Sequence, residues 1–410
     1  LFNNINNSID SNSWFSIKER NQFRKENLLQ FKNTKTSIKI IKCNKLIILP
    51  TDEQKEILLR LMKAYRLMYN RTIRMMRSKW KNNEKTSTNF KYIRTYLLKN
   101  EKDTLRRQYK APSHMLDGAI KLACASYKSA FTNYRNGNIK YFNIRYLKNN
   151  KKSHIIDIEK TAFSKNTFYK TFIKGEMKNK EDFCYTNIKY DSKLHYNAQT
   201  KRFTLLIPEK IESLNNNKNN DYISIDPGVR TFLSCLTNNN TIEISNNNQK
   251  YIKSKLLKID KINSLTNLKN KKKAISKRSV KIQNIITDLH WKSINYLMKK
   301  NKTNIIIGNW STKGCVSKKT FLNKMTKRII LKLRYYNFLQ RLTYKCKVYN
   351  KNLYVIDEAY TSKVCSNCCN ENVKLGSSKT FNCKNCNISL DRDFNGCRNI
   401  LLKSFSKTFQ

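Results

Sequence analysis

Apolar residues recur at helical spacing in two stretches of the first third of the chain. Thr51 precedes the first stretch and Gln54 follows three positions later, the spacing of a capping box at a helix start. The apolar residues that then share one helical face are Leu58, Leu61, Tyr65 and Met68. The second stretch starts near Ser113, a candidate cap, and its apolar stripe consists of Leu116, Ile120, Ala123, Tyr127 and Tyr134. We predict two helices that bury these stripes, with the opposite lysines and arginines either solvated or following phosphates.

Strand-like runs flank the predicted helices. The β-branched alternation of SIKIIKCNKLIIL predicts one or two strands before them, and IKYFNIRY, SHIIDIE and RFTLLIPEK predict β-structure after them, between about residues 139 and 209. The polar run SLNNNKNND, at about residues 213–221, predicts a linker and a domain boundary. Residues 1–36 are polar and lack a clear period, so we interpret them as an extension.

The C-terminal half alternates strand-like with helix-like patterns. The runs typical of strands are YISIDPGVRTFLSCL, TIEIS, NIIIGNW and NLYVIDEAY. Two segments between them place apolar residues on helical faces, namely Ile282, Ile285, Leu289 and Tyr296 in one and Leu331, Tyr335, Phe338 and Leu342 in the other. This alternation predicts an α/β domain. Its order, with a last helical segment after DRDFN, is that of an RNase H-like domain, although periodicity alone does not make that choice.

The charge of the chain indicates its class of partner. It carries 83 Lys and Arg against 28 Asp and Glu, a net charge of +55 over 410 residues. Such self-repulsion is tolerable mainly when a polyanion neutralises it, so we expect a nucleic-acid partner. Twelve cysteines are too few for a disulfide scaffold at this length and favour a reducing compartment. Without an apolar run of about 18 residues or a signal-like start, we expect a soluble, intracellular protein and no membrane partner.

Four of the cysteines have the spacing of a structural metal site. Cys365 and Cys368 are separated by two residues, as are Cys383 and Cys386. Each pair can close a tight turn over one tetrahedral ion, and four thiolates complete a zinc site that has no open position. Cys369 is an alternative to Cys368, but it lacks the two-residue spacing. We predict a zinc ribbon that acts as a scaffold and does no chemistry.

Two aspartates of this acid-poor chain stand where catalytic acids are expected. Asp226 ends YISID before a Pro-Gly pair, at the carboxyl edge of a strand where open α/β sheets carry their chemistry. Asp393 lies at a predicted helix start. Ordinary roles also fit, a turn for Asp226 and an N-cap for Asp393. Because phosphodiester hydrolysis by paired Mg²⁺ ions requires carboxylate ligands, we predict a Mg²⁺ site that includes both.

Several segments resemble one protein family. The segments IDPGVRTFLS, KLRYYNFLQRLTYKCKVYNKNLYVIDEAYTSKVCSNCC and FNCKNCNISLDRDFNGCRNIL together resemble the transposon-encoded TnpB nucleases and their eukaryotic and viral relatives, the Fanzor proteins. LPTDEQKEILLRLMKAYRLMYN and APSHMLDGAIKLACASYKSAF resemble the N-terminal half of that family, so the resemblance covers most of residues 40–405. It implies an RNA-guided, Mg²⁺-dependent DNA endonuclease with a RuvC-like domain, an Asp/Glu/Asp triad and an inserted zinc ribbon.

The resemblance also implies the partners and the cellular location. A noncoding guide RNA, the omega RNA, would select the target double-stranded DNA, and the protein would read a short flanking motif. The expected assembly is a monomeric ribonucleoprotein in the nucleus or the viral replication site of a eukaryotic host.

Residue by residue, the triad matches at its first and last members. Asp226 matches the first acid and Asp393 the last, while Asp391 is expected to orient its neighbours. In TnpB the middle Glu ends the fourth strand, where this chain has Gly308 and Asn309. The next strand ends in Glu358, which is similar to a relocated Glu in Fanzor proteins, and neighbouring strands lie only about 4.8 Å apart.

Asp357 and Glu358 point to opposite faces of their strand, so only one of them can serve in the triad. We choose Glu358 and keep Asp357 as the alternative.

The family architecture predicts the domain boundaries. They are a polar extension (1–36), a wedge-like β-barrel domain (37–50 and 139–215), an inserted helical recognition domain (51–138), a RuvC-like domain (219–363 and 388–410) and a zinc-ribbon insertion (364–387).

Residues 250–281 form a basic stretch in which Asp260 is the only acid. On a helix they would follow phosphates without base specificity, or they would form a solvated face. The candidate nucleic-acid-binding residues are Lys271, Lys272, Lys273, Lys277 and Arg278. The same cluster is a weak nuclear-localisation signal.

Two other functions stay open at the level of sequence. An unguided RuvC-like resolvase or transposase-associated protein would need no RNA. A catalytically inert nucleic-acid binder would explain the missing acid at position 308.

Overall fold

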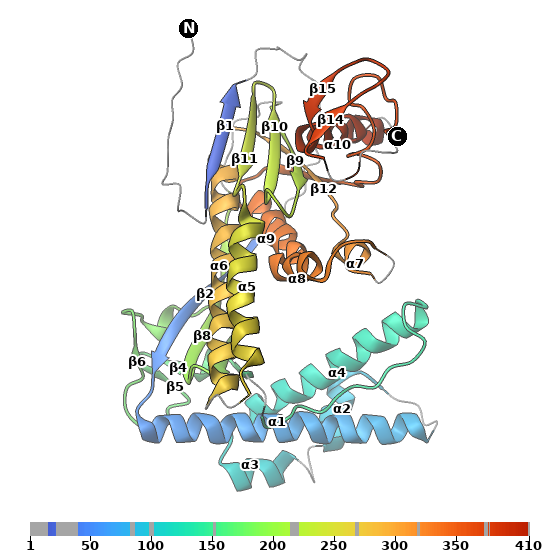
Figure 1. Cartoon of the computed structure of the whole chain (residues 1–410). Coiled ribbons are helices and arrows are strands. Elements are labelled where there is room, and N and C mark those ends of the chain that lie inside the picture. The colour runs from blue at the N-terminus through green and yellow to red at the C-terminus, as the bar shows by residue number, and fades with distance from the viewer. Residues whose placement is uncertain are drawn as a thin grey trace. The chain divides into compact units, whose positions relative to one another are not determined.

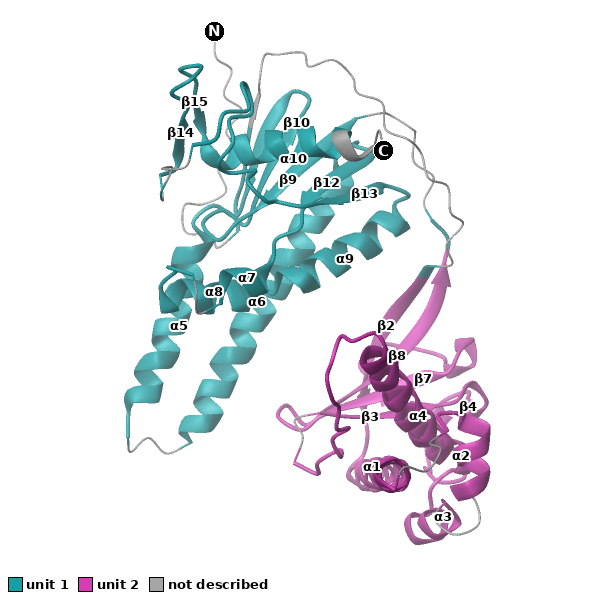
Figure 2. Ribbon diagram, turned by 90° about the vertical axis from the view of Figure 1, so that its right-hand side faces the viewer, with its two compact units in different colours: residues 1–40, 212–410 teal, residues 41–211 magenta. Residues whose placement is uncertain are grey.

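The computed structural model describes residues 15–21, 40–82, 87–97, 102–150, 153–213, 221–266, 270–317, 320–372, 376 and 378–408 (Figure 1). The chain divides into two compact units, shown in different colours in Figure 2. One comprises Leu1–Ile40 with Glu212–Gln410, and the other comprises Ile41–Ile211.

The unit Ile41–Ile211 packs helices against an antiparallel sheet. Its helices are α1 (Asp52–Lys81), α2 (Phe90–Leu97), α3 (Asp103–Tyr109) and α4 (Ser113–Arg135). Its main sheet has the order β3-β7-β8-β2-β6, with β2 (Ile40–Leu49), β3 (Ser153–Ile158), β6 (Lys178–Asn179), β7 (Ser192–Asn197) and β8 (Arg202–Ile211). A small hairpin joins β4 (Phe163–Ser164) to β5 (Thr167–Phe168). The chain thus enters the sheet, leaves it for the helices and returns to it.

The predicted capping box is confirmed. The Thr51 hydroxyl accepts from the Gln54 N–H at 3.3 Å, and the Thr51 N–H donates to Oε1 of Gln54 at 3.1 Å. The strand predicted for IKYFNIRY is wrong, because residues 139–148 form an irregular segment. Side chains of α1 satisfy its backbone in place of a strand partner. The Arg77 guanidinium donates to the Ile144 carbonyl, and the Asn70 amide bonds both backbone groups of Leu147.

One buried carboxylate joins three segments of this unit. Asp117 on α4 pairs with Lys102, which precedes α3, at 2.7 Å and with Arg94 on α2 at 3.1 Å. The side chain of Lys102 is only 1% exposed, so its charge depends on this partner. Removing one partner of a buried ion pair lowers folding stability by more than the intact pair contributes, because the remaining charge is buried without water or a counter-charge.

The other unit is built on a six-stranded mixed sheet of order β1-β11-β10-β9-β12-β13. Its strands are β1 (Ile17–Asn21), β9 (Tyr222–Pro227), β10 (Leu233–Thr237), β11 (Asn240–Ile244), β12 (Asn304–Gly308) and β13 (Asn352–Ile356). Strands β9, β12 and β13 run parallel, while β10, β11 and β1 pair antiparallel. The predicted α/β alternation is confirmed, and the runs NIIIGNW and NLYVIDEAY form the neighbouring strands β12 and β13, as expected.

Helices cover both faces of this sheet. They are α5 (Asn248–Ser264), α6 (Lys271–Lys299), α7 (Thr312–Cys315), α8 (Lys324–Leu333), α9 (Tyr335–Val348) and α10 (Arg392–Thr408). Because side chains alternate along a strand, Ile225 and Ile307 face α6, α8 and α9, whereas Tyr222, Ile306 and Ile356 face α10. The candidate site described below lies on the face that α10 covers.

Strand β1 corrects the interpretation of residues 1–36 as an extension. Ile17–Asn21 pair with β11 at the edge of the sheet. Glu19 fixes this strand through Lys300 at 2.8 Å, Tyr296 at 3.0 Å and Asn240 at 2.6 Å. Five residues of mixed polarity carry too weak a pattern to be recognised before their partner strand is known.

We expect Asp117→Leu to destabilise the unit Ile41–Ile211 by about 3–5 kcal/mol, because it strands the buried Lys102 charge. Chemical denaturation measures this change. The double variant Asp117→Leu/Lys102→Met is expected to recover most of the loss. Removing the exposed pair partner Asp52, as Asp52→Ala, is expected to cost less than about 1 kcal/mol. Equal costs for the buried and exposed pairs would contradict the assignment.

Candidate active site and metal centre

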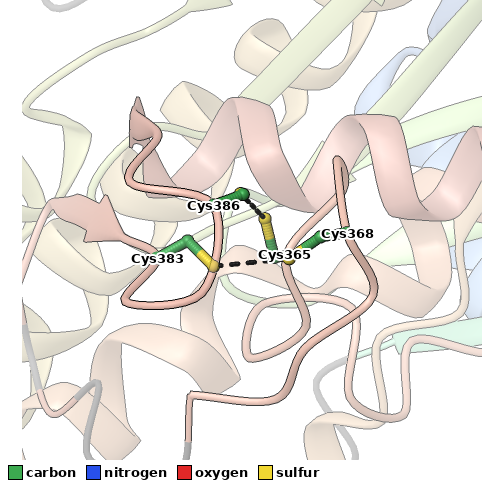
Figure 3. A group of neighbouring side chains, drawn as sticks. All are labelled: Cys365, Cys368, Cys383 and Cys386. Atoms are coloured by element: carbon green, nitrogen blue, oxygen red, sulfur yellow. Dashed lines mark hydrogen bonds between the residues drawn. The ribbon is translucent and has the colours of Figure 1, made fainter.

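The four predicted cysteines converge on one point (Figure 3). The sulfur atoms of Cys365 and Cys386 lie 3.7 Å apart and those of Cys368 and Cys383 lie 3.5 Å apart. All four lie within 4.8 Å of one another. Tetrahedral zinc with Zn–S bonds of about 2.3 Å requires sulfur separations of about 3.8 Å. The distances and the all-thiolate donor set therefore fit a zinc ion.

Local turns present these sulfur atoms. In the first turn, the Cys369 N–H donates to the Cys365 carbonyl, and Cys369 itself adopts a left-handed backbone with φ of 59°. Its side chain is exposed and lies outside the cluster, so Cys368 is the member of the set. In the second turn, the Cys383 N–H donates to Ile388. The short hairpin of β14 (Thr380–Asn382) and β15 (Ser389–Asp391) completes the ribbon around Phe381.

Two buried asparagines one turn apart fasten the ribbon to α10. Asn395 accepts from the Ser366 N–H at 2.9 Å and donates to the Val364 carbonyl at 2.8 Å. Asn399 donates to the carbonyls of Thr361 and Val364 at 2.8 and 2.7 Å. Neither asparagine is predicted from the sequence, because the backbone groups that they bond lie 29–38 residues away in the chain. Through them the first cysteine turn is held against the helix that starts with the predicted catalytic segment.

Asp226 lies at the carboxyl end of β9 and points to the α10 face. Its side chain falls on the same face as that of Ser224, whose hydroxyl donates to the Cys397 carbonyl of α10 at 2.7 Å. Oδ2 of Asp226 approaches Gly396 so closely that a Cβ atom there would lie 2.3 Å from it. Burial raises the pKa of Asp226 well above its usual value, and the charges of Glu358 and Asp393 raise it further. Asp226 is therefore within electrostatic reach of both other acids.

Glu358 follows β13 and lies over Gly308 of the neighbouring strand. Since Ile307 pairs with Ile225, Gly308 stands beside Asp226 in the sheet. A Cβ atom on Gly308 would point to the α10 face, as Ile306 does, and it would meet Oε1 of Glu358 at 2.1 Å. The Glu358 carboxylate thus lies on the same face as Asp226.

The Glu358 carboxyl group is largely buried. Burial raises its pKa to about 7, and Asp357 adds to the rise. Oε1 is buried and accepts no hydrogen bond from the described residues. Asp357, the alternative, is exposed and its carboxylate accepts only a long 3.4 Å bond from the Ala359 N–H among the bonds recorded for it.

Asp393 lies in the first turn of α10, where Asp391 accepts from its N–H at 2.9 Å. Asp391 therefore caps the helix and orients Asp393, which is the role expected for it. Burial and Asp391 raise the pKa of Asp393, and the nearby charges of Arg230, Lys379 and Arg392 oppose the rise. These cations favour an ionised Asp393.

The two sites differ in their spacing. Across the described ranges, the four cysteines form the only group of Cys, His or acidic side chains whose ligand atoms all lie within 4.8 Å of one another. The carboxylate oxygens of Asp226, Glu358 and Asp393 do not all lie within 4.8 Å of one another. Such spacing is compatible with two ions, which lie about 3.5–4 Å apart in two-metal sites.

The predicted basic cluster does not join the carboxylates. Lys271, Lys272, Lys273, Lys277 and Arg278 begin α6, at the end of the α5–α6 hairpin that lies far from the sheet (Figure 2). Asp260 forms a two-pronged ion pair with Arg328, at 2.8 Å for each bond, and so joins α5 to α8. The hairpin is thereby anchored near its middle while its basic end remains apart from the acids.

Comparison with known proteins agrees with this arrangement. The family described as "Cas12f1-like, TNB domain" matches residues 335–400, from α9 to α10, and the "Helix-turn-helix domain" matches residues 43–85. The TnpB-like protein L79 of Acanthamoeba polyphaga mimivirus is 33% identical over 411 residues, covering 94% of this chain and 76% of the relative. The TnpB-like protein L770 of the same virus is 33% identical over 417 residues with the same coverage.

This chain belongs to the TnpB-like family. Its fold is also shared with a solved structure, the Cas12f1-sgRNA-target DNA complex, at a TM-score of 0.52 and 15% identity, over 85% of this chain and 83% of that one. The TnpB-like fold here is mixed α/β and carries a cysteine cluster within the matched TNB segment. None of its described helices is both long and apolar enough to cross a membrane.

We expect the TnpB-like chain to bind one zinc ion and Cys383→Ser to lose it. Because Asn395 and Asn399 join the ribbon to α10, zinc loss should also loosen the start of that helix. Metal analysis measures the zinc content, and hydrogen exchange measures the protection of α10. The matched control is Cys369→Ser, which should keep zinc and α10 protection, since this thiol lies outside the cluster. The ligand assignment would be contradicted if Cys369→Ser lost zinc while Cys383→Ser kept it.

The raised pKa of Glu358 predicts that the stability of the protein depends on pH when no metal is bound to the carboxylates. A carboxyl group with a pKa near 4.5 in the unfolded protein and about 7 in the folded protein binds protons better in the folded state. The free energy of unfolding therefore falls as pH rises between these two values. At pH 8 Glu358→Gln should therefore stabilise the protein by up to about 3 kcal/mol, at about 1.4 kcal/mol per pKa unit, and the gain should vanish below pH 4. Denaturation of the zinc-loaded protein at both pH values, without Mg²⁺ or other added divalent cations, tests this. A constant difference would contradict it.

Proposed function

We propose that this TnpB-like protein is an RNA-guided, Mg²⁺-dependent DNA endonuclease that uses one RuvC-like active site. The proposal rests on one observation above all, the convergence of Asp226, Glu358 and Asp393 on the α10 face at the carboxyl edge of the parallel strands. Supporting it, the solved structure with the shared fold is a complex with sgRNA and target DNA. The net charge of +55 suits a protein that neutralises many phosphates.

The three carboxylates fit divalent cations by their chemistry. Mg²⁺ is bound through carboxylate oxygens, and the unpartnered Oε1 of Glu358 is a free ligand atom in a buried place. When bound, two such ions activate a water and stabilise the leaving oxygen of a phosphodiester. Asp226, Glu358 and Asp393 would hold them, and Asp391 would orient Asp393.

The remaining parts of the chain take supporting roles in this proposal. The cysteine set holds zinc and stiffens the ribbon that Asn395 and Asn399 fasten to α10. The basic start of α6 contacts nucleic-acid phosphates. We assign residues 219–363 and 388–410 to the RuvC-like domain, 364–387 to the ribbon, and the remaining segments as the family architecture predicts. The protein would act as a monomeric ribonucleoprotein in the nucleus or a viral replication site, with omega RNA as the guide.

The missing acid at position 308 does not by itself favour an inert binder. Gly308 stands where the TnpB resemblance places a Glu, yet the carboxylate of Glu358 lies directly over it. A carboxylate is therefore available at that point of the sheet from the neighbouring strand.

We expect Glu358→Gln to reduce cleavage of guide-matched DNA by at least about 10³-fold while leaving RNA and DNA binding intact. The reason is that the isosteric amide keeps the shape but removes a charged metal ligand. Cleavage assays in Mg²⁺ with the copurified RNA measure the rate, and Asp226→Asn should behave alike.

The matched control is Asp357→Asn, which should cleave within about threefold of the wild type. The reverse pattern would assign the role to Asp357. Wild-type protein that carries RNA of uniform length but never cuts matched DNA would overturn the nuclease proposal, and active protein without RNA would support an unguided nuclease.

A further inference from the structure

The backbone conformation of Gly308 does not require a glycine. Gly308 ends the buried strand β12, in register with Ile356 of β13, and it is not among the described glycines with positive φ. Glycine in a strand interior is less favourable than alanine, because a glycine loses more conformational freedom on folding. A residue of this kind in a central strand marks a place where something approaches the backbone closely.

What approaches Gly308 is the side chain of Glu358. A Cβ atom built on Gly308 would lie 2.1 Å from Oε1, 2.6 Å from Cγ and 2.7 Å from Cδ of Glu358. All three separations are far below van der Waals contact, so the whole outer part of the Glu358 side chain would have to leave. Gly396 differs in this respect, because there only the end of the Asp226 side chain comes closer than 3 Å.

The backbone of Gly308 is held in place and cannot give way instead. The Tyr335 hydroxyl donates to its carbonyl at 3.1 Å, and the next N–H, that of Asn309, donates to the Ile356 carbonyl at 2.6 Å. Tyr335 is itself buried against Trp310 and Phe338. The contact between Gly308 and Glu358 therefore fixes where the carboxylate lies.

We propose that Gly308 is a positioning residue for the active site, because its missing side chain leaves the space in which the Glu358 carboxylate lies. Glu358 can reach the α10 face beside Asp226 only because residue 308 has no side chain. Conversely, a short acid at 308 would extend from its Cβ into the volume that the Glu358 carboxylate occupies. This inference rests on the proposed function for its catalytic meaning, but the packing that it describes is independent of catalysis.

The first test is a double-variant cycle on stability, with the zinc-loaded, full-length protein in the absence of divalent cations other than zinc. Gly308→Ala should change the unfolding temperature by different amounts in the wild-type and Glu358→Ala backgrounds, because only the wild type contains the side chain that the new Cβ atom displaces. Gly314→Ala is the matched control, because a Cβ atom there would meet its nearest neighbour at 3.4 Å, an ordinary contact. Equal destabilisation by Gly308→Ala in both backgrounds would overturn the proposal.

The second test measures Mn²⁺ binding by electron paramagnetic resonance and, separately, guided DNA cleavage. We expect Gly308→Ala to weaken Mn²⁺ binding and cleavage by about 10–100-fold, the range for residues that orient metal ligands. Gly308→Asp/Glu358→Ala should recover most of the Mn²⁺ affinity, whereas Gly308→Ala/Glu358→Ala should not.

The outcomes separate the inference from the proposed function. If neither the wild type nor any variant cuts DNA but the Mn²⁺ affinities change as expected, the nuclease proposal fails and the positioning role stands. Wild-type Mn²⁺ affinity in Gly308→Ala, or no recovery in Gly308→Asp/Glu358→Ala, would overturn the positioning role.

Discussion

The packing of α10 across β9 and its neighbouring strands is the contact on which the site depends. Ser224 donates to the Cys397 carbonyl, and the Cys397 thiol donates to the Ser234 carbonyl at 3.0 Å, so the helix is bonded to two strands. Gly396 lets the helix come within contact distance of Asp226. Because Asp393 lies in the first turn of this helix, the packing brings together two acids that lie far apart in the chain. A small residue at 396 is therefore as much a part of the site as the acids are.

The zinc ribbon extends the same constraint. Asn395 and Asn399 use side-chain amides to satisfy backbone groups of the segment that enters the ribbon. Such bonds are made within a buried environment, where an unpaired polar group is costly. The cysteine turns, the entry segment after Glu358 and the first turn of α10 thus form one connected piece. The cysteine set therefore stands directly before the acidic segment in the sequence, because the ribbon supports the helix turn that carries Asp393.

The cost of this arrangement is electrostatic. Burial raises the pKa values of Asp226 and Glu358, the charges of Glu358 and Asp393 add to the rise at Asp226, and the charge of Asp357 adds to the rise at Glu358. Arg230, Lys379 and Arg392 act in the other direction at Asp393. A chain of net charge +55 has ample cations with which to balance three acids, yet none of the described residues forms a hydrogen bond with Oε1 of Glu358. Clustered acids of raised pKa in a basic protein are a functional signature, since they weaken the fold that contains them.

Sequence by itself determined the elements, the class of the C-terminal unit and the cysteine set, because each depends on local spacing. Capping at Thr51, strand alternation around Asp226 and the two Cys-x-x-Cys pairs are short-range patterns with a direct physical meaning. The edge strand β1, the irregular segment 139–148 and the roles of Gly308, Asn395 and Asn399 were decided only by tertiary structure. Each depends on a partner distant in the chain, such as β11, Asn70 or Glu358. A glycine in a strand has no pattern of its own, and its meaning appears only when the side chain that fills its space is known.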